Sequence, residues 1–231
     1  MEDAIQPSDF PVGTVQDIID RLPKYFTICV ASKRNSGKSV LVMEMIQDLM
    51  RQKRVDMVVV MSGSAHLNDD YKLLPKKLVM PFNERILANV WYSQTKKEAK
   101  DRKHILFVFD DCLSSPEAIR NPLLTRIYTL GRHVAVSGIL ISQHTASLLS
   151  PTIKGNSDII LWSQLNKGQL QNLADSTTNI STKDFVRLSE TLGGHDFQFL
   201  LLDNYNRSTN PSEFLAVVKA KPPKEKKEHK V

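Results

Sequence analysis

One short segment constrains this chain more than any other: a buried strand pattern that passes through a loop containing glycine and lysine into a helix pattern. Tyr25–Ala31 is rich in β-branched and aromatic residues, which favours a buried strand. Val40–Arg54 carries apolar residues in a helical stripe with polar residues opposite. The loop between them, Ser32–Ser39, reads SKRNSGKS. This order of strand, loop and helix is the context that the phosphate-binding pattern G-x-x-x-x-G-K-S/T requires.

The residue types in this loop suit a nucleoside triphosphate with Mg²⁺. Gly37 leaves room for backbone N–H groups to close on phosphates, and the helix that follows offers unpaired donors and a positive dipole end. Lys38 supplies a charge at the β- and γ-phosphates, and the Ser39 hydroxyl suits a Mg²⁺ shell. Ser32 replaces the first glycine of the pattern, which it can do where its φ is negative. We therefore predict ATP binding by Ser32, Lys33, Arg34, Asn35, Ser36, Gly37, Lys38, Ser39 and Val40.

A second strand pattern, Ile105–Asp111, ends in two adjacent carboxylates. Ligands bind at the carboxyl ends of parallel strands, so both side chains should reach the phosphate site. We expect Asp110 to hold the Mg²⁺ shell through water. Asp111 should point to the other side of the strand end and polarise the attacking water as the base. The alternative is two solvated carboxylates at the start of a turn.

Gln143 follows the buried strand pattern Ser137–Ser142. An amide at a strand tip beside two carboxylates can hydrogen-bond a γ-phosphate or orient a water molecule. A lone glutamine after a strand is otherwise an ordinary loop residue. We therefore include Gln143 among the catalytic candidates, together with Lys38 and Asp111.

The remaining patterns predict a three-layer α/β domain of the P-loop type. Buried strand patterns without polar alternation are interleaved with helix patterns, which indicates a mainly parallel sheet covered on both faces. Near the C-terminus, two strand patterns separated by a polar segment favour an antiparallel pair. The predicted helices are Thr14–Lys24, Val40–Arg54 and Pro122–Leu130, and the predicted strands are Tyr25–Ala31, Met57–Met61, the end of Ile86–Tyr92, Ile105–Asp111, Ser137–Ser142, Asp158–Trp162, Phe197–Asp203 and Glu213–Val218.

The chain divides into three predicted regions: an N-terminal segment 1–24 with a short helix, an ATPase domain 25–218, and a basic tail 219–231. The tail holds six lysines against two glutamates, so it accounts for most of the net charge of +6. It also contains Pro222 and Pro223 and few apolar residues, which predicts disorder. Such a tail either aids solubility or contacts DNA.

Membrane insertion and secretion are not indicated. No apolar run approaches the roughly 20 residues that a helix needs to span a bilayer. The N-terminus lacks the basic and then apolar order of a secretory signal. We expect a soluble intracellular protein in which Cys29 and Cys112 are buried, reduced thiols.

Four segments resemble a known family. The runs Phe107–Cys112, Gly131–His133, Ile139–Gln143 and Lys154–Asp158 are similar to the genome-packaging ATPases of large double-stranded DNA viruses, within the FtsK–HerA superfamily of ring-forming DNA pumps. The resemblance covers roughly Tyr25 to Val218. It implies a further strand between the phosphate-loop strand and the Asp110 strand, and this separation argues against a Cys29–Cys112 disulfide.

The resemblance also implies a homo-oligomeric ring, pentamer or hexamer, in which each subunit lends an arginine to its neighbour's nucleotide. Arg132 is the first candidate and Arg126 the second. We expect Arg132, which precedes the strand that leads to Gln143, to emerge near the carboxyl edge of the sheet. The alternative for Arg132 is an ordinary helix-end arginine that faces a C-terminal dipole. Gln143 corresponds to the family's glutamine sensor.

The function expected from the resemblance is an ATP-hydrolysing motor that translocates double-stranded viral DNA into a preformed capsid. Its partners would be DNA bound without sequence preference and a capsid vertex or portal-like protein, in the host-cell cytoplasm or virus factory. The alternatives are a plasmid-transfer or chromosome-partition pump, and a nucleotide-dependent capsid assembly factor that does not move DNA. The densest basic stretch inside the domain could grip DNA phosphates, although a solvated charged face also explains it; it contains Lys96, Lys97, Lys100, Arg102 and Lys103.

Overall fold

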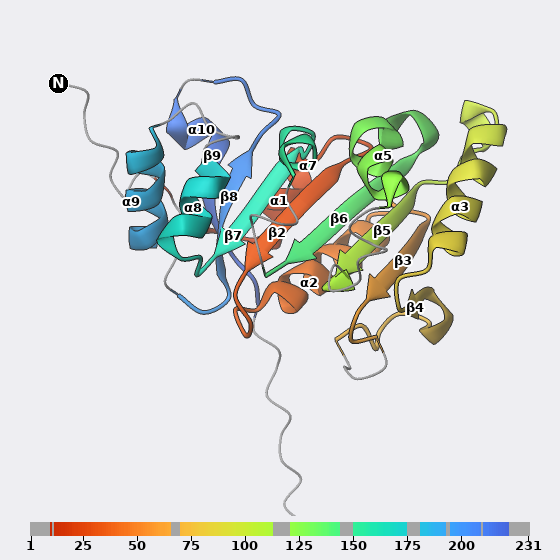
Figure 1. Cartoon of the computed structure of the whole chain (residues 1–231), viewed down its shortest axis with the longest axis horizontal. Helices are drawn as coiled ribbons and strands as arrows, with labels where there is room; N and C mark the ends of the chain where they lie inside the picture. Colours follow the sequence, from red (N-terminus) through yellow and green to blue (C-terminus); the bar gives the residue numbers. More distant parts are fainter. Residues whose placement is uncertain are drawn as a thin grey trace, which may run out of the picture.

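The structure is a computed structural model of the 231-residue chain. It describes residues 10, 12–65, 70–112, 121–143, 150–174, 181–192, 195–208 and 210–221. A single twisted sheet runs through the molecule, with helices on both of its faces (Figure 1).

Within the described residues the sheet has nine strands in the order β1-β9-β8-β7-β2-β6-β5-β3-β4. The six strands from β7 to β4 in this order run parallel, whereas β8 is antiparallel to both β7 and β9. The mainly parallel sheet and the C-terminal antiparallel pair are thus confirmed. The strands are β1 Val12–Gly13, β2 Thr27–Ser32, β3 Met57–Ser62, β4 Val79–Met80, β5 Ile105–Asp110, β6 Val136–Ser142, β7 Ile159–Ser163, β8 Gln198–Asp203 and β9 Leu215–Lys219.

Strand β6 lies between β2 and β5, as the family resemblance implies. Gly138 is the register partner of Thr27 on one side and of Phe107 on the other. Because the three strands are parallel, their carboxyl ends meet at one edge of the sheet, which we call the carboxyl edge. Cys29 and Cys112 are both free and buried, with β6 between their strands.

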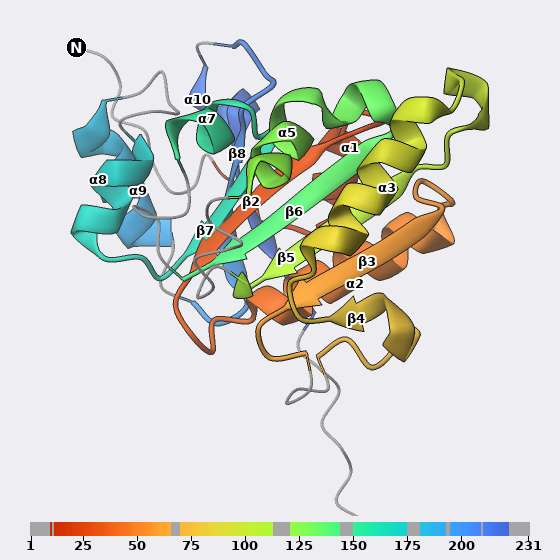
Figure 2. The same cartoon turned by 45° about the vertical axis from the view of Figure 1, so that its right-hand side comes forward.

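Helices form the two outer layers. One buried hydrophobic cluster joins α3, α5, α8 and α9 to one face of the sheet, and a second joins α1 and α2 to the opposite face. Figure 2 shows α3 and α5 in front of the sheet and α1 and α2 behind it. No helix of the described part of the chain is long and apolar enough to cross a membrane. The helices are α1 Val15–Arg21, α2 Lys38–Arg51, α3 Glu84–Lys96, α5 Pro122–Leu130, α7 Pro151–Gly155, α8 Lys167–Ala174, α9 Thr182–Leu192 and α10 Pro211–Phe214.

The segment Ile86–Tyr92 was expected to end in a strand, and this prediction is wrong: it lies within helix α3. Asn83 caps the helix by accepting a hydrogen bond from the Ile86 N–H at 3.0 Å. Leu87, Trp91 and Gln94 recur at helical spacing and are buried. Ile86, Val90 and Trp91 pack against the core from one side of the helix, whereas Tyr92 is exposed, so tertiary contacts override the local strand preference.

Both ends of the described chain pack with the central domain. Thr14 is the N-cap of α1, where the Asp17 carboxylate accepts hydrogen bonds from the Thr14 N–H (2.6 Å) and hydroxyl (2.9 Å). At the other end, β9 includes Lys219, and Ala220 is only 1% exposed. Lys221 contacts Glu44 of α2 through its backbone N–H (2.9 Å) and its ammonium (3.4 Å). Residues 222–231 of the basic tail lie outside the described residues, so their disorder stays a prediction.

Candidate nucleotide site

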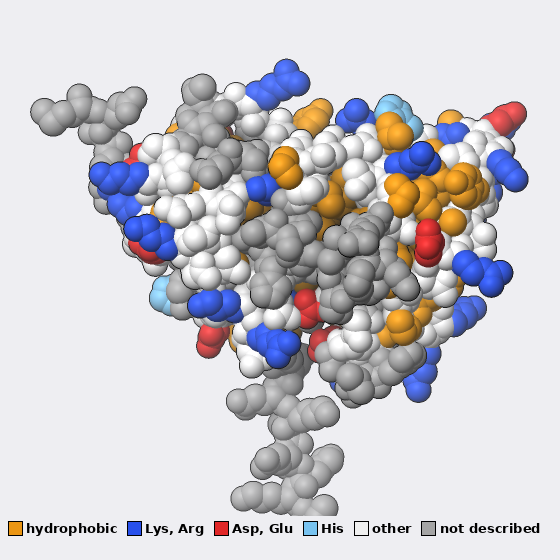
Figure 3. All heavy atoms as spheres, in the orientation of Figure 1, with side chains coloured by type: hydrophobic (Ala, Val, Ile, Leu, Met, Phe, Trp, Pro, Cys, Tyr) orange, Lys and Arg blue, Asp and Glu red, His pale blue; other side chains and the backbone are white. Residues whose placement is uncertain are grey.

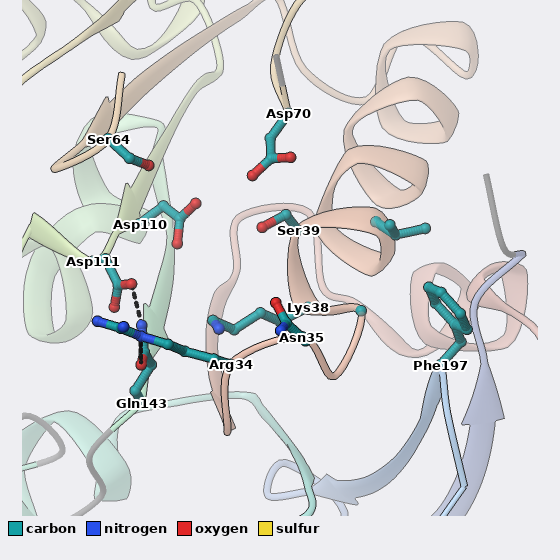
Figure 4. A pocket seen from close by; sticks show the side chains of 12 residues that line it. Arg34, Asn35, Lys38, Ser39, Ser64, Asp70, Asp110, Asp111, Gln143 and Phe197 are labelled. Carbon is teal, nitrogen blue, oxygen red and sulfur yellow. Dashed lines mark hydrogen bonds between the residues drawn. The ribbon is translucent and has the colours of Figure 1, made fainter. Parts of the chain in front are cut away.

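A cavity of about 480 Å³ opens at the carboxyl edge, and we call it the phosphate-loop cavity. Its walls come from the loop after β2, the start of α2, and the ends of β3, β5 and β6, with one residue from the C-terminal hairpin (Figure 4). The lining residues are Arg34, Asn35, Gly37, Lys38, Ser39, Val40, Ser64, Asp70, Asp110, Asp111, Gln143 and Phe197.

The loop between β2 and α2 has the backbone that phosphate binding needs. Gly37 has a φ of 88°, and a Cβ at this position would lie 2.5 Å from Phe197 Cδ1. Only glycine fits both constraints. Helix α2 begins immediately afterwards at Lys38, and its N-cap glycine has no side chain to occupy the first N–H groups. These donors are therefore left for a ligand.

Ser32, which replaces the usual glycine, has a structural role. It is the last residue of β2 and pairs with Ser163 of β7, so its backbone is extended. The Ser32 hydroxyl donates to the Ser36 hydroxyl, and Ser36 donates in turn to the Lys33 carbonyl at 2.9 Å. The serine thus ties together the two sides of the loop and removes no phosphate-binding group.

Lys38 lies across the loop. Its side chain is only 8% exposed, and Nζ donates to the Lys33 carbonyl at 3.3 Å. This bond is to a neutral acceptor, so the ammonium carries a full charge that no carboxylate within the loop neutralises. An anionic ligand would be a stronger acceptor for this ammonium than the carbonyl is, so the arrangement suits anion binding.

Asp110 ends β5 and is buried, with 5% of its surface exposed. The pKa of Asp110 is raised to about 6, mainly by burial and also by the charges of Asp111 and Asp70, against the opposing effects of Tyr71 and Lys38. The Tyr71 hydroxyl donates to Asp110 Oδ2 at 2.9 Å. A bound cation would favour the charged carboxylate. The carboxylate and hydroxyl oxygens of Asp110 and Ser39 are the donors that Mg²⁺ prefers, so these residues fit the predicted metal.

Asp111 lines the same cavity as Asp110, beside Gln143 (Figure 4). Its backbone is left-handed, with a φ of 48°, and its carboxylate accepts a hydrogen bond from Gln143 Nε2. Arg34 Nε donates to Gln143 Oε1 at 3.1 Å, so the glutamine amide is held at both ends (Figure 4). Gln169 Nε2 also donates to the Gln143 carbonyl at 3.2 Å. The structure therefore brings together Gln143 and both carboxylates, as the order of motifs predicted.

Arg132 was expected near the carboxyl edge, and that placement is wrong. It lies in the short 3₁₀ segment Gly131–Val134, which leads into the amino end of β6. The phosphate loop follows the carboxyl end of β2, so the length of the parallel strands separates it from Arg132. Arg132 lines a separate cavity of about 250 Å³ at the amino edge, together with Thr27 and Asp158. Arg126 is exposed on α5, next to Ile127 and Tyr128, which line the same amino-edge cavity.

The basic stretch that was weighed as a DNA contact has local partners. Arg102 Nε donates to the carbonyls of Gln94 (3.0 Å) and Lys97 (3.1 Å), and Lys100 pairs with Glu98 at 2.9 Å. Figure 3 shows lysine and arginine side chains spread over several parts of one face of the molecule. These contacts favour the solvated charged face over a dedicated DNA grip.

Three cavity residues escaped the sequence reasoning: Ser64, Asp70 and Phe197. Tyr71, which is not part of the cavity lining, also escaped it and acts through Asp110. Ser64 could have been found from the sequence, because it follows β3, which lies parallel to β5 and ends at the same edge of the sheet. Asp70, Tyr71 and Phe197 reach the site through chain connections that no motif marks.

Solved structures of similar fold include a viral genome-packaging NTPase, conjugation coupling proteins and a Type VII secretion ATPase. The genome-packaging NTPase B204 of Sulfolobus turreted icosahedral virus 2, in complex with ATP-γS, matches with a TM-score of 0.59 at 15% identity, over 87% of this chain and 99% of that one. The bacterial conjugative coupling protein TrwB matches at 0.58 and 10% identity, over 94% and 90%. The pCW3 conjugation coupling protein TcpA, with ATP-γS, matches at 0.54 and 16% identity, over 77% and 57%.

The two sequence comparisons found no match for this chain. No protein-family model matches the chain, and no curated protein sequence does. The observed strand order and the cavity, together with these likenesses, show that this chain has the P-loop fold shared by a viral genome-packaging NTPase and conjugative coupling proteins.

Proposed function

We propose that this chain is an ATP-hydrolysing motor subunit that moves double-stranded DNA into a preformed viral capsid. The observation that carries the proposal is the meeting of Lys38, Ser39, Asp110, Asp111 and Gln143 in one cavity. The likeness to a genome-packaging NTPase that was solved with ATP-γS supports both the substrate and the task.

Each side chain has a task in this proposal. Lys38 and the first N–H groups of α2 hold the β- and γ-phosphates. Ser39 and Asp110 offer oxygen ligands to Mg²⁺, which neutralises charge on the phosphate oxygens when bound. Asp111 accepts a hydrogen bond from the attacking water and polarises it.

Gln143 responds to the γ-phosphate in this scheme. Arg34 now donates to the neutral Gln143 amide oxygen at 3.1 Å. A phosphate oxygen is a stronger acceptor for a guanidinium than an amide is. ATP would therefore draw Arg34 away and leave Gln143 Oε1 to orient the water beside Asp111.

The motor acts as a ring in this proposal, with a capsid vertex or portal-like protein as its partner. An arginine from the neighbouring subunit would stabilise the transferring phosphoryl group. Arg126, the second candidate from the sequence, is exposed on α5 and is the arginine to test first. Mixed rings of Arg126→Ala and Lys38→Ala subunits should recover some ATPase activity, since an intact cavity then meets an intact arginine at some interfaces.

A plasmid-transfer pump is the second candidate, because two conjugative coupling proteins share the fold. The test common to both motors is ATP turnover with and without duplex DNA, alongside displacement of a third strand from a duplex as the readout of translocation. We expect DNA to stimulate turnover and ATP to drive displacement, with Lys38→Ala inactive in both. Turnover that ignores DNA would instead favour a nucleotide-dependent assembly factor.

A further inference from the structure

The phosphate-loop cavity has two chemically different ends. Asp110, Asp111 and Gln143 lie at one end, and Phe197 lies across Lys38 from Asp111 and Gln143 (Figure 4). Phe197 and Val40 are the apolar side chains of a lining that is otherwise polar, charged or glycine. The far end is therefore suited to a flat apolar group.

The position of Phe197 is unusual and well fixed. Its φ of 58° places a bulky aromatic residue in the left-handed region, and residues strained in this way cluster at functional sites. The Phe197 carbonyl accepts a hydrogen bond from the Ala220 N–H at 2.9 Å, and the next residue begins β8. The ring is half-buried and packs directly over Gly37. A strained backbone thus holds this ring against the phosphate loop.

The proposed function fixes the direction of a nucleotide in the cavity. Its γ-phosphate must lie toward Asp111 and Gln143, where hydrolysis occurs. The α-phosphate and the nucleoside then extend past Ser39 toward Val40 and Phe197. We infer that Phe197 is the surface on which the nucleotide base stacks, an assignment that rests on the proposed function.

Stacking on an aromatic ring is tolerant of base identity, because every base presents a π-face. The chain should therefore bind ATP and GTP with similar affinity, apart from contacts made by neighbouring polar groups. The same ring that limits residue 37 to glycine would position the base, which links phosphate and base recognition through one contact.

The experiment separates the base from the phosphates. Isothermal titration would measure the affinity of a non-hydrolysable ATP analogue and of inorganic tripolyphosphate, each with Mg²⁺, for the full chain and for Phe197→Leu and Phe197→Tyr. Stacking is worth about 1–3 kcal/mol per base, so Phe197→Leu should lower the affinity for the ATP analogue by roughly tenfold and leave the affinity for tripolyphosphate unchanged. Phe197→Tyr, which keeps the ring, should bind both ligands as the unaltered chain does.

A second variant guards against a Leu protein that fails to fold. In Phe197→Trp, the ATP analogue should quench tryptophan emission and tripolyphosphate should not. The unaltered chain, whose Trp91 and Trp162 are buried, provides the baseline. An equal loss of affinity for both ligands in Phe197→Leu, or full affinity for the analogue, would overturn the inference. If the unaltered chain binds neither ligand, the proposed function itself fails.

Discussion

The two edges of the sheet use the same kinds of charged side chain in opposite ways. At the amino edge, charges are tied to the backbone: Arg54 donates to the carbonyls of Ile19 (2.6 Å), Leu22 (2.9 Å) and Pro23 (2.9 Å). Asp158 accepts from the Thr27 N–H at 2.8 Å. These bonds close the end of α1 and the start of β2, so they support the fold.

At the carboxyl edge, charges are left with weaker partners. Lys38 bonds one carbonyl at 3.3 Å, and Asp110 is buried against a tyrosine hydroxyl with its pKa raised to about 6. Left-handed backbone occurs at both edges: at Asn35, Gly37, Asp111 and Phe197 here, and at Lys53 and Ala135 before the amino ends of β3 and β6. The difference teaches that weakly partnered charge marks the site, whereas charge or backbone strain alone does not.

The largest expected effect comes from Lys38→Ala. Nucleotide binding or hydrolysis should become undetectable, because no other ammonium reaches the β- and γ-phosphates in the proposed site. Isothermal titration with a non-hydrolysable ATP analogue and Mg²⁺ measures the affinity of the variant for nucleotide. The matched control is Arg54→Ala at the amino edge, and an equal loss of affinity there would break the comparison between the edges.

Asp111→Asn should stop turnover and spare binding. The asparagine keeps an oxygen for Gln143 but is no longer basic, so kcat should fall about 10²–10⁴-fold. Affinity for the ATP analogue should stay within about twofold, since Asp110 and Ser39 remain. Wild-type turnover in Asp111→Asn would refute the assignment of Asp111 as the base.

Asp110→Asn should stabilise the metal-free protein while it abolishes Mg²⁺-dependent turnover. The folded pKa of Asp110 is about 6, against 3.8 for the free side chain, so the folded state binds more protons between these values. Stability of the unaltered chain should therefore fall as the pH rises from about 4 to 6, by about 3 kcal/mol in total. Asparagine removes this loss and still accepts from Tyr71.

Urea unfolding of the unaltered chain and of Asp110→Asn at pH 4 and pH 7 tests the sign of the predicted stability difference. The two proteins should be nearly equal at pH 4, and Asp110→Asn should be the more stable at pH 7. A destabilised Asp110→Asn at pH 7 would mean that the carboxylate supports the fold, as charges at the amino edge do.

Arg54→Ala carries the smallest predicted change, in the opposite direction. Loss of three hydrogen bonds from a charged donor should destabilise the fold by about 2 kcal/mol. The affinity for ATP analogue should not change. Thermal unfolding of Arg54→Ala and of Asp110→Asn, measured side by side, would show whether the first variant is less stable and the second more stable than the unaltered chain.

Much of this organisation is readable from the sequence, and the exceptions share a cause. Motifs that are contiguous in the chain, such as Ser32–Ser39 and Ile105–Asp111, predict their own local geometry and strand context. Gln143 was found because parallel strands bring their carboxyl ends together. Arg132 was misplaced because a residue just before a strand lies at its amino end. Phe197 and Tyr71 depend on long-range packing, and helix α3 on tertiary contacts that override local preference.

The strand order also sets when the site can form during synthesis. Strand β2 is made early, yet both of its neighbours come more than 100 residues later: Thr27 pairs with Gly138, and Ile28 pairs with Ile159. Such distant pairings are slow to close, and a nascent chain cannot make them before β7 has left the ribosome. Phe197 arrives later still. Nucleotide binding would thus report that the chain has been made and folded through Phe197, and not only through the phosphate loop.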